Sequence, residues 1–136
     1  MIAVDTNVWV RYVTNDDEIQ AQQAMALLGS NEILVTKTVL LELGWVLEAV
    51  YDLPSEVVLR AMRHILGLPN VRVEAPGEVS LALNLYGKGL DFADAMHLAS
   101  AGAASVFYTF DGKFSRSARA HGYPVIPVAE AGPAKE

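Results

Sequence analysis

The residues in this chain that could do chemistry are four carboxylates in apolar surroundings. Asp5 follows the apolar run Met1–Val4, Asp111 follows a second such run, and Glu42 and Asp94 interrupt apolar stretches of helical character. An ionised carboxylate loses several kcal/mol of hydration in an apolar setting unless a cation or donors replace the water. The recurrence of four such acids predicts one shared, cation-binding pocket.

The elements that must position these acids alternate between short apolar strands and helices. The predicted strands are Ile2–Val4, Ile33–Val35, Val71–Val73, Val106–Thr109 and Val125–Val128. The predicted helices are Asn7–Tyr12, Asp16–Leu28, Thr38–Tyr51, Pro54–Leu66, Gly77–Tyr86, Asp91–Ala103 and Lys113–Ala120. Short apolar strands without polar alternation are typical of sheets covered on both faces. We therefore expect a three-layer α/β/α fold with a central, mainly parallel sheet.

In such a sheet the ligand site lies beyond the carboxyl ends of the strands. Asp5 and Asp111 each follow a predicted strand, so we expect both in one crevice. Each also has a local alternative. Asp5 is a good helix cap, and Asp111 with Gly112 is a turn signal.

Glu42 and Asp94 are expected to reach the pocket from helices. The helix around Glu42 is apolar nearly all round, which predicts burial, and the alternative is a salt bridge to Lys37 or a distant arginine. Asp91 is expected to cap the next helix and Asp94 to be the pocket ligand, although an acid in a first turn is also favoured by the helix dipole. His97 lies one turn after Asp94, as a ligand or a packed neighbour.

One basic cluster follows the fourth acid. Lys113, Arg116 and Arg119 lie on the helix that begins beside Asp111. They could bind phosphate groups, and the alternative is an ordinary solvated helix face.

Composition narrows the class of protein. The chain has 136 residues, no cysteine and a net charge of −6. We expect a single domain over residues 1–128 and a flexible C-terminal tail over residues 129–136. The absence of cysteine excludes zinc–thiolate sites and thiol nucleophiles. We expect neither a signal peptide nor a membrane span, and hence a cytoplasmic protein.

Four short motifs together resemble a known family. Val4–Val8, Leu41–Leu43, Asp91–Ala99 and Thr109–Asp111 are similar, in order and spacing, to the motifs of PIN domains, specifically the VapC-type toxins of toxin–antitoxin pairs. The resemblance implies a metal-dependent endoribonuclease that forms a homodimer and is held inactive by a cognate antitoxin protein.

The resemblance also implies roles for single residues. Asp5, Glu42, Asp94 and Asp111 would be the catalytic acids and the ligands of Mg²⁺ or Mn²⁺, the cations that oxygen ligands select. Thr6, Asn7 and Thr109 would support them or hold water. Two alternatives are a catalytically weak PIN-like binding module and a metal-dependent phosphatase. The phosphatase would want a second Asp where this chain has Asn7.

Overall fold

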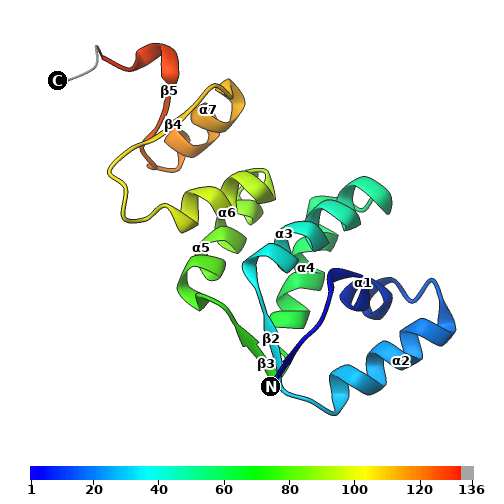
Figure 1. Cartoon of the computed structure of the whole chain (residues 1–136). Helices are drawn as coiled ribbons and strands as arrows, with labels where there is room; N and C mark the ends of the chain where they lie inside the picture. Colours follow the sequence, from blue (N-terminus) through cyan, green and yellow to red (C-terminus); the bar gives the residue numbers. More distant parts are fainter. Residues whose placement is uncertain (133–136) are drawn as a thin grey trace. The chain divides into compact units, whose positions relative to one another are not determined.

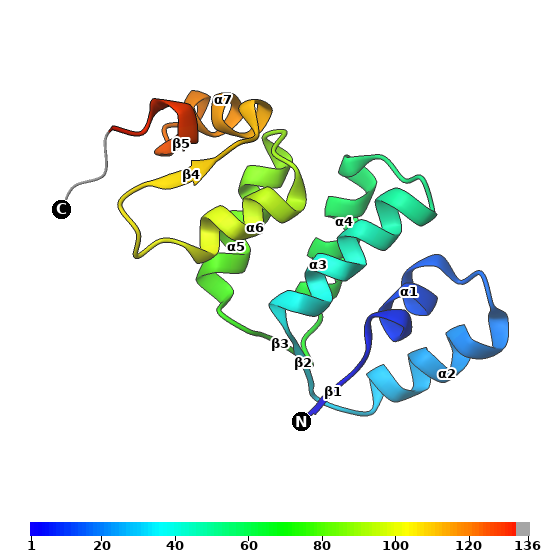
Figure 2. The same ribbon diagram turned by 45° about the horizontal axis from the view of Figure 1, so that its top comes forward.

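The computed structural model describes residues 1–132 (Figures 1 and 2). The chain divides into two compact units, Met1–Ser80 and Leu81–Glu136. The division falls inside one helix, α5 (Pro76–Gly87). Each unit is a parallel α/β arrangement of its own, and each carries two of the four predicted acids.

The first unit is built on a three-stranded sheet. Its elements are β1 (Ile2–Ala3), α1 (Thr6–Thr14), α2 (Glu18–Gly29), β2 (Ile33–Val35), α3 (Lys37–Trp45), the π-helical turn η1 (Val46–Val50), α4 (Ser55–Leu66) and β3 (Val71–Val73). The strand order is β1-β2-β3, and both pairings are parallel. Ile33 of β2 pairs with Ile2 on one side and with Val71 on the other.

The core of the first unit surrounds the central strand. Ile33 and Val35 of β2 are at most 1% exposed. Trp9 of α1, Leu40 of α3 and Met62 of α4 are buried to the same extent. Helix α1 packs against both α2 and α3, and α4 packs on β3. Because β1 ends at Ala3 and α1 begins at Thr6, Asp5 is held at the carboxyl end of the sheet.

The second unit is built on a two-stranded sheet. After the end of α5 it contains α6 (Phe92–Ser100), β4 (Phe107–Thr109), α7 (Gly112–Ala120), β5 (Val125–Pro127) and the 3₁₀ turn η2 (Val128–Glu130). Strands β4 and β5 are parallel, and α7 packs on β5. Phe114 and Ala118 of α7 are buried. Asp111 lies two residues after the carboxyl end of β4.

The predicted elements are confirmed in type and order, with differences at many of their ends. Asn15 adopts a left-handed conformation (φ 54°) that ends α1, and α2 begins at Glu18 with Asp17 as its cap, two residues after the predicted start at Asp16. The predicted helix Thr38–Tyr51 ends as an α-helix at Trp45 and continues as η1.

The predicted C-terminal tail begins with structure. Its first two residues belong to η2, and Glu130 accepts a hydrogen bond from Arg119. Residues 133–136 lie outside the described residues. None of the helices described in residues 1–132 is long and apolar enough to cross a membrane.

Asn70 supplies a test of how the first unit is tied together. Its side-chain amide donates to the Leu28 carbonyl at 2.6 Å and to the Asn31 carbonyl at 2.8 Å, joining the end of α2 to the start of β3. We expect Asn70→Ala to lower the free energy of unfolding by about 1–3 kcal/mol, because both half-buried carbonyls lose a donor. Urea unfolding measures this.

A matched control for Asn70 is Asn84→Ala. Asn84 is exposed on α5 and makes no side-chain hydrogen bond within residues 1–132. Alanine should leave stability there unchanged or slightly raised, because it favours helix. Equal destabilisation by the two substitutions would contradict a bridging role for Asn70.

Candidate active site

Asp5 and Glu42 line one hollow on the first unit. The hollow has a volume of about 290 Å³ and opens to solvent. It is bordered by α1, α3, η1 and the residue after η1. The lining residues are Asp5, Thr6, Asn7, Val10, Arg11, Glu42, Val46, Val50 and Tyr51. The structure therefore brings together the two acids that the sequence placed at a strand end and inside a helix.

Asp5 is both a helix cap and a pocket residue. Its side chain accepts a hydrogen bond from the Thr6 amide at 2.7 Å, and its backbone is extended (φ −69°, ψ 158°). The capping alternative for Asp5 is therefore correct, but it does not exclude a ligand role, because a carboxylate has further lone pairs. Thr6 is buried at 4% exposure, whereas Asn7 is exposed and lines the hollow.

The expected burial of Glu42 is wrong. Glu42 is exposed, because only Leu40, Leu43 and Gly44 form the buried stripe of α3. Trp45, one turn after Glu42, is 64% exposed. The salt bridge expected as the alternative is not formed with Lys37, which pairs with Glu78 at 2.6 Å. Glu42 thus presents an unpaired carboxylate to the hollow within the described part of the chain.

Asp94 and Asp111 interact electrostatically in the second unit. The pKa of Asp94 is raised, first because partial burial disfavours its charged form, then because Asp91 and Asp111 repel that charge. His97 opposes the shift. Asp94 is therefore surrounded by two other carboxylates and one histidine. A divalent cation would relieve the repulsion among such carboxylates.

Asp91 has the capping role predicted for it. Its side chain accepts a hydrogen bond from the Asp94 amide at 3.2 Å at the start of α6. Asp94, in the first helical turn, is half-buried. His97 is exposed one turn further along. Asp91 therefore caps the helix, whereas the Asp94 side chain makes no hydrogen bond or ion pair within residues 1–132.

Asp111 caps α7 and is oriented by Thr109. The Asp111 side chain accepts from the Phe114 amide at 3.1 Å, and the Asp111 amide donates to Thr109 Oγ1 at 3.0 Å. The Thr109 hydroxyl therefore fixes the backbone from which Asp111 projects. This contact gives a physical basis for the supporting role predicted for Thr109.

The three basic residues of α7 do not behave alike. Arg119 donates to the Val125 carbonyl at 2.9 Å and pairs with Glu130, so it is used to hold β5 and η2. Lys113 and Arg116 are exposed. Arg116 folds back across the start of α7, where its Nη1 lies 2.8 Å from the position a Cβ on Gly112 would take. All three side chains are exposed, but only Lys113 and Arg116 have no ion-pair partner within residues 1–132.

Sequence reasoning missed Arg11 and Tyr51 as pocket residues. Both line the hollow of Asp5 and Glu42. Arg11 lies one helical turn after Asn7, and that i, i+4 spacing was the available signal. Tyr51 had no signal, because its position depends on the wider π-helical turn before it. Short π-helical segments occur often at functional sites.

The donor set of the hollow and of the Asp94–Asp111 pair consists of carboxylate oxygens. Within residues 1–132, no group of three or more His, Asp or Glu side chains could by itself hold a metal ion. Mg²⁺ is commonly held by one or two carboxylates and keeps several waters. Each pair of acids therefore fits a hard divalent cation in number and chemistry.

Asp94 gives a pH-dependent test. Because its folded-state pKa is raised, its contribution to stability is full below the unfolded pKa and is lost as pH rises through the folded pKa. In EDTA near neutral pH, Asp94→Asn should melt no lower than wild type, and the difference should vanish in acid. The gain should stay below about 1 kcal/mol, because the group is partly solvated and screened.

Added Mn²⁺ should reverse this order of stability. A cation that binds only the folded state raises stability by mass action, and the variant should lose most of that gain. Thermal melts with Mn²⁺ and with EDTA over a pH series measure both effects. A variant that melts well below wild type in EDTA would show that Asp94 is stabilising by itself.

Comparison with known proteins places the whole arrangement in one family. The chain is similar to the crystal structure of VapC20 from Mycobacterium tuberculosis, described as a toxin that cleaves the sarcin–ricin loop. The identity is 23%, the TM-score 0.44, and the match covers 90% of this chain and 96% of that one. No curated protein matches the sequence. The PIN domain family matches residues 2–120, a span that covers most of the chain and includes all four acids, and this confirms the predicted three-layer α/β/α class. The chain belongs to the PIN domain family.

Proposed function

We propose that this protein is a metal-dependent endoribonuclease and the toxin of a toxin–antitoxin pair. The proposal combines membership of the PIN domain family with the VapC-type motifs in the sequence. Its substrate is RNA, its cofactor is Mg²⁺ or Mn²⁺, and Asp5, Glu42, Asp94 and Asp111 are its catalytic acids. The PIN domain covers residues 1–128.

The observation that carries the proposal is the concentration of uncompensated carboxylates. Asp5 and Glu42 share a solvent-open hollow, and Glu42 has no ion-pair partner within residues 1–132. The pKa of Asp94 is raised by burial, Asp91 and Asp111. Perturbed carboxylates that border a hollow are typical of functional sites, and carboxylates are the ligands that Mg²⁺ and Mn²⁺ prefer.

The metal ion would be held by these carboxylates together with water. Such an ion lowers the pKa of bound water and stabilises charge on phosphodiester oxygens during in-line attack. Under this proposal, water is the nucleophile. The candidate site residues offer only carboxylates, hydroxyls and one amide, from residues 5–7, 42, 94, 109 and 111. Thr109 holds the Asp111 backbone, and Asn7 offers an amide to the same hollow as Asp5.

The net charge of −6 is compatible with an RNA substrate under this proposal. A protein that binds nucleic acid without a metal usually carries a basic surface. Here bound cations would offset the acids at the site itself. Lys113 and Arg116, both exposed beside Asp111, would then contact the RNA backbone.

The biological setting follows from the same resemblance. The protein would act in the cytoplasm as a homodimer and would be held inactive by a cognate antitoxin. A small reading frame next to its gene that encodes a DNA-binding protein would support the pairing. Light scattering of the purified protein with and without that partner measures the oligomeric state.

Cleavage of RNA tests the proposed function. Purified protein should cut total RNA with Mn²⁺ or Mg²⁺ and should not cut it with EDTA. Asp5→Asn should reduce the rate at least about a hundredfold, because several kcal/mol of metal-dependent stabilisation are lost. The folded state should survive, since Asn caps helices about as well as Asp.

Asp91→Asn is the matched control for this assay. It removes one carboxylate near Asp94 but keeps a capping residue at the start of α6. Its cleavage rate should stay close to that of wild type. Retained activity in Asp5→Asn, or no metal-dependent cleavage by wild type, would leave a non-catalytic PIN-like binding module as the better description.

A further inference from the structure

Arg11 on α1 is fixed by three side-chain hydrogen bonds. Its Nε donates to Gln20 Oε1 at 2.7 Å, and its Nη1 donates to Asp16 Oδ1 at 2.9 Å and to the Tyr51 hydroxyl at 3.3 Å. These partners come from α2, from the α1–α2 loop and from the residue after η1. A guanidinium held in this way has lost most of its rotamer freedom before any ligand arrives.

The partners of Arg11 are also hydrogen-bonded to one another. The Tyr51 hydroxyl donates to Asp16 Oδ2 at 2.7 Å, and Thr14 Oγ1 lies 2.9 Å from Asp16 Oδ1. The pKa of Asp16 is lowered, first by the hydrogen bond from Tyr51, then by the one from Thr14, and further by the charge of Arg11. Asp16 therefore stays ionised and anchors the guanidinium across the ordinary pH range.

One edge of the guanidinium remains available. Of the five N–H groups of an arginine, those on Nε and Nη1 are engaged, and Nη2 has no partner within residues 1–132. The Arg11 side chain is 31% exposed. Arg11 also lines the hollow that contains Asp5 and Glu42. The guanidinium of Arg11 thus lies in the same hollow as Asp5 and Glu42 but makes no hydrogen bond to either carboxylate.

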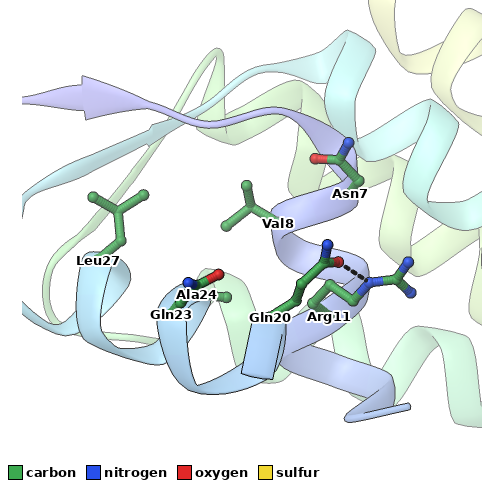
Figure 3. A pocket seen from close by; sticks show the side chains of 7 residues that line it. All are labelled: Asn7, Val8, Arg11, Gln20, Gln23, Ala24 and Leu27. Carbon is green, nitrogen blue, oxygen red and sulfur yellow. Dashed lines mark hydrogen bonds between the residues drawn. The ribbon is translucent and has the colours of Figure 1, made fainter. Parts of the chain in front are cut away.

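A second hollow adjoins this one on the other side of Arg11. It has a volume of about 250 Å³ and lies between α1 and α2 (Figure 3). Asn7 and Arg11 line both hollows. Figure 3 shows them one turn apart on α1, with Gln20 bonded to Arg11 and Gln23, Ala24 and Leu27 following along α2. The remaining wall is formed by Val8.

We propose that Arg11 binds a backbone phosphate of the RNA beside the scissile one, and that the attached nucleotide occupies the hollow between α1 and α2. This inference rests on the proposed function. Phosphate oxygens accept from an arginine edge in a fixed geometry. Gln23 offers an amide that can pair with a base edge, and Ala24 and Leu27 offer apolar surface to the base.

The chemistry of the two hollows favours a single RNA strand over a duplex. Unpaired bases can be splayed apart and read by side chains in small pockets, whereas paired bases in an RNA helix cannot. Because Asn7 and Arg11 of α1 line both hollows, an RNA strand that crosses these two residues would pass from the first hollow into the second. The first hollow is dominated by acids, so Arg11 supplies the positive charge that the strand needs there.

The first test compares two arginines. Binding of a fluorescein-labelled, single-stranded RNA of mixed sequence is measured by anisotropy in EDTA, so that cleavage does not interfere. Arg11→Gln should weaken binding about tenfold. The slope of log K for RNA binding against log salt concentration should become shallower by about 0.7, the value for one lost phosphate contact on a single strand. Arg63→Gln is the matched control, because Arg63 is exposed on α4 and lines neither hollow.

The second test keeps the Arg11 network intact in case its loss disturbs the fold. Gln23→Glu places a negative charge in the hollow between α1 and α2, and Gln22→Glu places the same charge on the same helix outside it. Gln23→Glu should weaken RNA binding at least about fivefold relative to Gln22→Glu, because the charge repels the strand only in the hollow. Melting temperatures of the two variants should agree.

The outcomes separate this inference from the proposed function. If wild type cleaves RNA with Mn²⁺ but both pairs of variants bind RNA equally, the inference is overturned and the ribonuclease assignment stands. If wild type neither binds nor cleaves RNA, both fail. Loss of binding in Arg11→Gln and Gln23→Glu, with normal binding in Arg63→Gln and Gln22→Glu, supports the nucleotide site.

Discussion

Repulsion between ionised carboxylates is the constraint on which the rest of this structure depends. Partial burial raises the pKa of Asp94 most, and the charges of Asp91 and Asp111 raise it further. Asp5 and Glu42 face a common hollow. Repulsion at Asp94 costs stability in the absence of a counter-charge. Under the proposed function, a divalent cation bound beside Asp94 would restore that stability.

The scaffold positions each acid with ordinary backbone chemistry. Asp5 and Asp111 cap the helices that follow β1 and β4, so strand ends and helix starts fix their places. Asp91 caps α6 and leaves Asp94 free one turn later. The network of Arg11 adds one fixed positive group to the wall of an otherwise acidic hollow. Asp5 and Asp111 therefore serve both as helix caps and as candidate site residues.

The sequence predicted the elements well because most of them carry local signals. Strands β2 and β3 agree with their predicted ends, and Asp91 has its predicted capping role. The burial of Glu42 was predicted wrongly, because an apolar helix was taken to be covered on all sides, whereas Trp45 on the same helix is largely exposed. The spacing of Arg11 from Asn7 could have placed Arg11 at the hollow. Its hydrogen bond to Tyr51, 40 positions away, could not be predicted, since it depends on a π-helical turn that has no sequence signal.

The most direct test of the central claim is the affinity for Mn²⁺ of wild type, Asp5→Asn and Asp94→Asn, measured by calorimetric titration. Under the proposed function, both acids are ligands of a divalent cation. Each substitution should therefore weaken Mn²⁺ binding by at least about tenfold, roughly 1.4 kcal/mol. Wild-type affinity in either variant would contradict the role of that acid as a metal ligand.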